Sequence, residues 1–212
     1  MQYLYAFQEV RMIKNIVFDI GNVLLKWAPY DTVSKVFPNH PNTYELNQKI
    51  FKSSTWMDLN RGKMTEKEAI FLYHQELGIS ISKLEELMKE VKLSLSPIEG
   101  SFELLDKLHN KGFAIYSITD NVREIIHFER QRYPLFDKFL GMVISADIGA
   151  LKPDEEIYRY LLKTYHLKAE ECVFIDDLLI NIEGAKKVGM HGIQFVTAEF
   201  CKDELNKLGV EF

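Results

Sequence analysis

The sequence has few cysteines and no long hydrophobic run, and these two absences exclude several classes of protein. Its two cysteines among 212 residues, Cys172 and Cys201, are too few for a disulfide scaffold and lack the spacing of metal ligands. No uninterrupted apolar stretch reaches the roughly 20 residues that a membrane-spanning helix needs. We therefore expect a protein of the reducing cytoplasm that has no membrane partner.

An excess of positive charge is also absent. The chain has 26 lysines and arginines against 31 aspartates and glutamates, so its formal net charge is −5. Because binding to a phosphate backbone requires clustered basic side chains, we expect no nucleic-acid partner. The apolar fraction of 47% is that of an ordinary globular protein, which we expect to be a monomer or a homodimer.

Short apolar runs alternate with helical patterns along most of the chain. Runs rich in β-branched and aromatic residues occupy positions 15–19, 113–117, 142–145, 172–176 and 192–196. Amphipathic helical patterns lie between them, and Pro153 fits the first position of one such helix. Strands that alternate with helices predict an α/β fold, with a Rossmann-like core built on a parallel sheet.

One long segment interrupts this alternation. Positions 30–95 contain no convincing strand, only amphipathic helical patterns, and Thr65 with Glu68 has the spacing of a capping box. We therefore predict that 12–27 and 96–212 form the α/β core and that 28–95 form an inserted helical-bundle cap. Residues 1–11 precede the first strand and make a poor signal peptide, so we expect them to be an N-terminal extension.

Polar side chains lie where the predicted strands end. In a parallel sheet, ligands bind beside the carboxyl ends of the strands. Those ends carry Asp19, Ser117, Thr119, Lys152, Asp176 and Asp177. Carboxylates that lie close together repel each other unless a cation separates them, and a set of oxygen ligands without histidine or cysteine favours Mg²⁺. The pattern therefore predicts a magnesium-dependent site for phosphoryl transfer, where one aspartate attacks phosphorus.

The order and wording of these motifs resemble a known superfamily. FDIGNVL, YSIT, GALKPDEEIY and VFIDDLLINIEGAKKVGM are similar to the four motifs of haloacid dehalogenase-like (HAD) proteins. The helical insert resembles the C1 cap of that superfamily. The G-N-V ending of the first motif and the turn at Asn60-Arg61-Gly62 resemble the branch with α-glucose-1-phosphatase-type enzymes. The resemblance implies a phosphatase that hydrolyses a small phosphorylated metabolite through an aspartyl-phosphate intermediate.

The resemblance also implies the ligands of the metal. Asp19 matches the nucleophile, which is also a metal ligand, and the carbonyl oxygen of Gly21 matches a backbone ligand. Asp177 matches a direct ligand of Mg²⁺, and Asp176 matches a second one. Asn181 fits the position that orients a water molecule on the metal.

Other residues match positions that hold the phosphoryl group or the substrate. Ser117 matches the hydroxyl of the second motif, with Thr119 as the alternative, and Lys152 matches the lysine that offsets negative charge. In the loop after the nucleophile, Gly21 and Asn22 are expected to contact the substrate. From the cap, Arg61 and Trp56 are further candidates for substrate binding, since Arg61 can clamp an anionic or hydroxyl-rich group.

One position departs from the pattern of the superfamily's phosphatases. They usually carry a second aspartate two residues after the nucleophile, as the general acid and base, and this chain has Gly21 there. Loss of such a group slows expulsion of an alkoxide by roughly 10²–10⁴. Either another group takes the role of this acid, or the leaving group needs less help. An anomeric oxygen leaves more readily than a primary alkoxide, so a sugar 1-phosphate fits the second case and is the substrate we favour.

Two other functions remain open on the sequence. A metal-independent dehalogenase of the haloacid type also lacks the second aspartate, but it has no use for the adjacent acids Asp176 and Asp177. A regulatory protein that binds a phosphate ligand with impaired turnover would keep all the binding residues.

Overall fold

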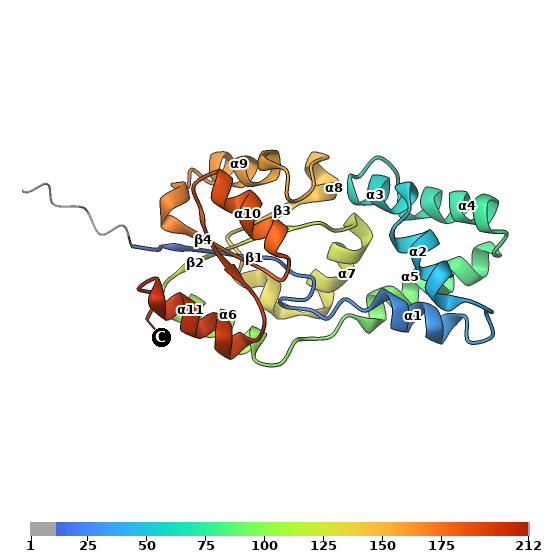
Figure 1. Ribbon diagram of the computed structural model, residues 1–212, viewed down its shortest axis with the longest axis horizontal. Helices are drawn as coiled ribbons and strands as arrows, with labels where there is room; N and C mark the ends of the chain where they lie inside the picture. The colour runs from blue at the N-terminus through green and yellow to red at the C-terminus, as the bar shows by residue number, and fades with distance from the viewer. Residues whose placement is uncertain (1–11, 212) are drawn as a thin grey trace, which may run out of the picture.

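A parallel five-stranded sheet forms the centre of the molecule. The structure, a computed structural model, describes residues 12–211. The strand order is β3-β2-β1-β4-β5, and every pairing between neighbours is parallel (Figure 1). The strands are β1 (Asn15–Phe18), β2 (Ala114–Thr119), β3 (Gly141–Ile144), β4 (Cys172–Asp176) and β5 (His191–Gln194). This confirms the predicted α/β class with a Rossmann-like parallel sheet.

Helices cover both faces of this sheet, which is why its strands are almost entirely apolar. On one face, α9 (Glu155–Thr164) and α10 (Leu179–Lys187) pack on apolar side chains of β1, β2 and β4. The other face is covered by α6 (Ser101–Asn110), α7 (Arg123–Arg132) and α11 (Ala198–Lys207) (Figure 1). The carboxyl edge of the strands remains as the place where polar side chains gather.

Five helices lie between β1 and α6, at the right-hand end of Figure 1. They are α1 (Pro29–Val36), α2 (Thr43–Phe51), α3 (Ser54–Asn60), α4 (Glu66–Leu77) and α5 (Ile81–Ser94). The capping box of Thr65 and Glu68 is present at the start of α4, and Gly78 ends that helix in the left-handed conformation. The cap boundaries at positions 28 and 95 stay a prediction, and residues 1–11 lie outside the described residues.

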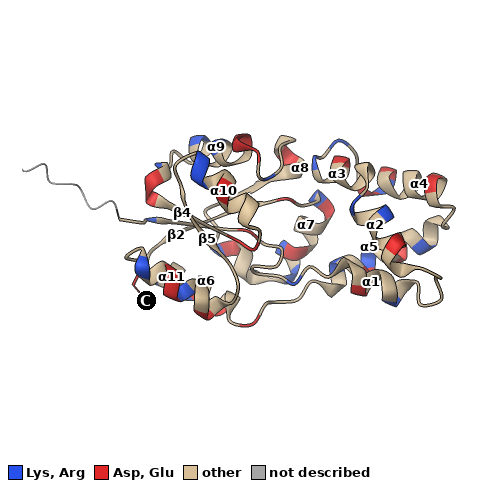
Figure 2. Ribbon diagram, in the orientation of Figure 1, with Lys and Arg blue, Asp and Glu red and all other residues tan. Residues whose placement is uncertain are grey.

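Short elements complete the chain: α8 (Ser145–Ile148) and two 3₁₀ helices, η1 (Pro134–Lys138) and η2 (Ala169–Glu171). Within residues 12–211, no helix has both the length and the apolar character needed to cross a membrane. Lysines and arginines alternate with acidic residues over the surface helices (Figure 2).

Several expectations about local structure are wrong, and one of them is the last strand, which ends at Gln194 and not at position 196. Pro153 is not the first residue of a helix, because α9 begins at Glu155, after Asp154 as its N-cap. The segment before it forms a turn, closed by the Asp154 amide on the Leu151 carbonyl at 3.0 Å. The second strand also extends two residues beyond the predicted end at Ser117, to Thr119.

Candidate active site

A buried lysine joins two strand ends at the carboxyl edge of the sheet. The Lys152 ammonium lies 2.8 Å from Oδ1 of Asp19, which follows β1, and 2.7 Å from Oδ2 of Asp176, the last residue of β4. These three side chains are 2%, 9% and 0% exposed, respectively. Burial of charge is costly, so three ionisable groups held this close indicate a functional site.

The carboxylate of Asp176 accepts hydrogen bonds from several donors. Besides Lys152, it accepts hydrogen bonds from the Leu178 amide at 2.8 Å and from Nδ2 of Asn181 at 3.0 and 3.1 Å. The carbonyl oxygen of Asn181 accepts a bond from the Tyr158 hydroxyl at 2.8 Å, which fixes the first turn of α10. The structure therefore places Asn181 against Asp176, where it orients that carboxylate.

Asn22 connects the loop after β1 to the second acid of the pair. Its Nδ2 donates to Oδ2 of Asp177 at 3.3 Å, and its Oδ1 accepts from the Trp27 amide at 3.0 Å. The backbone of Asn22 has a φ of 55°, a conformation that asparagine tolerates better than most residues. Its observed contacts hold the loop, and its predicted contact with the substrate stays a prediction.

Three carboxylates have the spacing to hold one metal ion. Asp19, Asp176 and Asp177 each offer an oxygen, and these oxygens lie within 4.8 Å of one another. Burial and the nearby Asp176 raise the pKa of Asp19, against the opposing effect of Lys152. Burial and Asp176 likewise raise the pKa of Asp177. A divalent cation would relieve this repulsion, and the oxygen-only donor set suits Mg²⁺.

The structure separates the two hydroxyl candidates of the second motif. Ser117 lies inside β2, paired with Phe18, and its fully buried Oγ has no hydrogen-bond partner among the described residues. Thr119 is buried as well, but it is the last residue of β2, beside Asp120 at the carboxyl edge. Of the two, Thr119 is the residue at the carboxyl edge of the sheet, and the role of either hydroxyl stays a prediction.

Asp120 belongs to the site and was missed by the sequence analysis. Its Oδ1 accepts a hydrogen bond from the Lys152 amide at 3.0 Å, which ties the β2 loop to the lysine loop. Burial raises the pKa of this carboxyl. Its position directly after a strand was a usable signal, the same one that identified Asp19.

Glu129 is a second buried acid that the sequence did not reveal. It lies on α7, is 1% exposed, and its Oε2 has no hydrogen-bond partner within the described chain. The carboxyl also forms a hydrogen bond with the Asn121 side chain. Burial, together with the charge of Asp19, raises its pKa to about 8. No signal in the helical pattern around it pointed to this position.

The two cap candidates differ in their freedom to meet a substrate. Trp56 is buried in an aromatic cluster, where it stacks on Trp27 with ring centres 5.9 Å apart and meets Phe51 edge-on at 4.8 Å. Arg61 is half-buried, and its guanidinium has no hydrogen bond or ion pair to any residue of 12–211. Of the two, Arg61 is the one with unused donors.

The turn that carries Arg61 is fixed against the sheet edge. The Asn60 carbonyl accepts a bond from Oγ of Ser145, the first residue after β3, at 2.7 Å. The Gly62 carbonyl accepts from Nη1 of Arg123 at 3.2 Å, and Nη2 of Arg123 also donates to the Ala146 carbonyl. The cap turn therefore lies at the same end of the sheet as the carboxylates.

The backbone conformation at position 21 does not require a glycine. Its φ is not positive, and a Cβ added there would meet only Cβ of Trp27, at an ordinary contact distance of 3.9 Å. A Cβ therefore fits at this position without strain, and neither backbone conformation nor contact at Cβ requires a glycine here.

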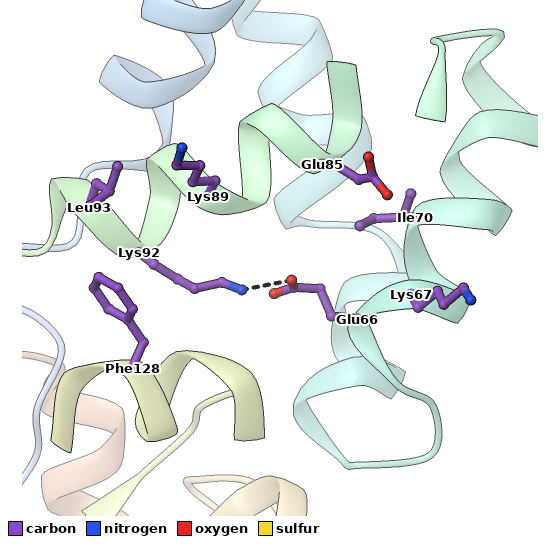
Figure 3. A pocket seen from close by; sticks show the side chains of 8 residues that line it. All are labelled: Glu66, Lys67, Ile70, Glu85, Lys89, Lys92, Leu93 and Phe128. Carbon is purple, nitrogen blue, oxygen red and sulfur yellow. Dashed lines mark hydrogen bonds and ion pairs between the residues drawn. The ribbon is translucent and has the colours of Figure 1, made fainter. Parts of the chain in front are cut away.

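A pocket of about 440 Å³ lies elsewhere, between α4, α5 and Phe128 of α7 (Figure 3). The Lys92 ammonium crosses it to Oε1 of Glu66 at 2.7 Å, while Lys67 and Lys89 extend away from that pair (Figure 3). None of the carboxylates of the site lines this pocket.

The fold and the carboxylate centre define an α/β enzyme with a metal-binding acidic site, and comparison with known proteins identifies its family. The chain belongs to the family described as haloacid dehalogenase-like hydrolase, whose model matches residues 16–195. The predicted superfamily is thereby confirmed, and so is the prediction of a hydrolase. The narrower resemblance to the α-glucose-1-phosphatase branch stays a prediction.

Named relatives agree with phosphate esters as the class of substrate. The chain is 29% identical to the sesquiterpene phosphatase astK of Aspergillus oryzae, over 92% of this chain and 96% of that protein. It is 25% identical to D-ribitol-5-phosphate phosphatase of Bacteroides thetaiotaomicron, over 86% of this chain and 92% of the relative. A HAD family enzyme of that bacterium, solved with magnesium and inorganic phosphate, shares the fold with a TM-score of 0.72 at 20% identity, over 87% and 95% of the two chains.

Proposed function

We propose that this protein is a magnesium-dependent phosphatase that hydrolyses a small phosphorylated metabolite through an aspartyl-phosphate. The observation that carries the proposal is the buried cluster of Asp19, Lys152 and Asp176, with Asp177 close enough to share a metal ion. Bound Mg²⁺ would supply positive charge beside the transferred phosphoryl group. Asp19, Asp176 and Asp177 would hold it, together with the Gly21 carbonyl that the family pattern implies.

Three residues of the chain would each have a separate role in the reaction. An oxygen of Asp19 forms a bond to phosphorus while the ester P–O bond breaks, and the leaving oxygen takes the electron pair. Lys152 offsets the negative charge on the nucleophile, and the Thr119 hydroxyl is placed to donate to the phosphoryl oxygens. Water then attacks phosphorus and releases phosphate, which regenerates the Asp19 carboxylate.

Gly21 restricts the leaving group. With no carboxyl at this position to protonate the departing oxygen, a leaving oxygen less basic than a primary alkoxide fits best. The anomeric oxygen of a sugar 1-phosphate meets this requirement, and it is the substrate that the sequence favours. The relatives named above act on a sesquiterpene and on ribitol 5-phosphate, so phosphatases similar to this chain take organic groups of very different polarity.

A dehalogenase is the second candidate, and the acidic pair argues against it. Carbon–halogen cleavage uses one nucleophilic aspartate and needs no metal, whereas here Asp177 lies beside Asp19 and Asp176 in a metal-binding arrangement. The fixed positions of these acids support the phosphatase.

A screen of small phosphorylated metabolites, with Mg²⁺ and with EDTA, tests the proposal. We expect steady release of phosphate that EDTA abolishes and that Asp19→Asn lowers by at least about 10³-fold, because the nucleophile is lost. Activity that survives Asp19→Asn contradicts the mechanism. Binding of phosphate without turnover would favour the regulatory function, and metal-free release of halide would favour the dehalogenase.

The substitution Gly21→Asp tests the argument about the leaving group. A Cβ fits at this position, so we expect the variant to fold and to accelerate hydrolysis of a sugar 6-phosphate, by up to roughly 10²-fold, more than that of a sugar 1-phosphate. Gly21→Asn is the matched control, since it has the same shape without a carboxyl. Equal effects of the two substitutions on both substrates would contradict the argument.

A further inference from the structure

Three large aliphatic side chains lie exposed beside the carboxylates. Leu178, Leu179 and Ile180 follow directly after Asp177 and are 53%, 55% and 62% exposed. Single exposed aliphatic residues are common on protein surfaces, but a contiguous group beside a candidate site indicates a binding surface. We call these three residues the aliphatic patch.

The patch is fixed to the site by its backbone. The Leu178 amide donates to Oδ1 of Asp176 at 2.8 Å, and Leu179 begins α10. In Figure 2 the first turn of α10 is uncharged and lies toward helices α1–α5, while the lysines of this helix lie at its other end. The backbone that carries the patch is therefore joined to the carboxylate cluster, at the end of α10 that lies toward α1–α5.

Trp27 provides an apolar surface on the other side of the same centre. Its amide donates to Asn22, which in turn donates to Asp177, so one chain of hydrogen bonds joins Trp27 to the residue before the patch. The half-buried indole is supported from behind by Trp56 and Phe51. Cβ of Trp27 lies 3.9 Å from the position that a Cβ on Gly21 would take, so this residue stands next to the loop that follows Asp19.

We infer that the organic part of the substrate is a hydrocarbon group, held between the indole of Trp27 and the aliphatic patch. This inference rests on the proposed phosphatase function, and it names a substrate class other than the sugar 1-phosphate that the sequence favours. Aliphatic and aromatic carbon offers no hydrogen bonds, so the hydroxyls of a sugar would lose their water partners here without replacement. Hydrocarbon buried on these surfaces gains affinity instead, by up to about fourfold for each fully buried methylene.

A series of n-alkyl phosphates from ethyl to octyl, assayed with Mg²⁺, tests the inference. We expect kcat/KM to rise about two- to fourfold per methylene, through KM rather than kcat, because the chain binds equally in the ground and transition states. Leu179→Ser should flatten this slope. Its matched control is Leu140→Ser, which alters a similarly exposed leucine just before β3 and should keep the slope. Trp27→Ala should also flatten the slope, and Trp27→Phe should restore part of it.

Several results would overturn the inference. A flat slope in the unaltered protein would do so, as would tighter calorimetric binding of glucose 1-phosphate than of octyl phosphate to Asp19→Asn. If Leu179→Ser leaves the slope intact but abolishes a dimer seen by sedimentation, the patch is a contact between copies of this chain. Calorimetric binding of the same alkyl phosphates to Asp19→Asn separates the two proposals, since a chain-length slope there supports the subsite even if turnover of every phosphate ester fails.

Discussion

Two clusters of lysine and carboxylate differ sharply in their surroundings. Lys152 contacts Asp19 and Asp176 at the sheet edge, where water has almost no access. Lys92 contacts Glu66 across the pocket of Figure 3, where both side chains remain about a sixth exposed. A partly hydrated ion pair has a small desolvation cost and contributes little to the free energy of unfolding. A fully dehydrated pair has a large desolvation cost, which indicates that its geometry serves a function. In this protein, the buried ion pairs identify the candidate active site, whereas the pocket of Figure 3 lies elsewhere.

The largest expected effect comes from removing the buried lysine. Lys152→Met leaves Asp19 and Asp176 uncompensated, so we expect the free energy of unfolding to fall by about 3–5 kcal/mol and turnover to be lost. Mg²⁺ should restore part of the stability by replacing the missing charge, but it should not restore turnover. Urea unfolding with and without Mg²⁺ measures both effects. An unchanged free energy of unfolding would contradict the assignment of a buried ion-pair network.

Glu129 adds a third case, a buried carboxyl with no cation beside it. Its pKa is raised from an ordinary 4.5 to about 8, so the folded protein binds this proton more tightly than the unfolded chain does. The contribution of Glu129 to stability is therefore complete below about pH 4.5 and is lost as the pH rises through 8. Glu129→Gln cannot ionise, so its stability relative to the unaltered protein should increase with pH by at most about 1.4 kcal/mol per unit. Unfolding at pH 5, 7 and 9 measures this, and parallel pH curves would contradict it.

The smallest effect is expected at the partly hydrated pair of Lys92 and Glu66. Lys92→Met should lower the free energy of unfolding by less than about 1 kcal/mol and leave kcat and KM unchanged, because solvent screens the lost interaction. The same urea series measures it beside Lys152→Met. A loss that rivals that of Lys152→Met would remove the distinction between the two clusters.

The sequence predicted that Asp19, Lys152 and the acidic pair lie at one edge of the sheet, where the structure brings them together, because strand ends are easy to recognise. Asp19 and the acidic pair each close a run of buried apolar residues, and parallel strands bring such ends to one edge. The hydroxyl was harder to assign, because the end of β2 was misjudged by two residues and a strand has no sharp sequence marker for its last position. Pro153 was misplaced for a similar reason, since the turn before α9 depends on a distant partner, Asp120.

Other residues were beyond the reach of local pattern. Glu129 lies among charged residues on α7, and only tertiary packing turns its side chain inward. Trp56 is a residue type that often contacts substrates, but in the structure its ring stacks on Trp27. In both cases, the environment of the side chain is set by residues far along the chain.

The position of β1 at the middle of the sheet has a consequence for how the protein is made. β1 leaves the ribosome first among the described strands. Its first residue, Asn15, pairs with Cys172 of β4, which is synthesised 157 residues later. The helices α1–α5 emerge in between and are rich in local contacts, so they can form before the sheet exists. Asp19 is therefore synthesised early, but Asp176 and Asp177, the two acids with which it can share a metal ion, are added only with β4. A chain that ends before β4 thus lacks the metal-binding cluster.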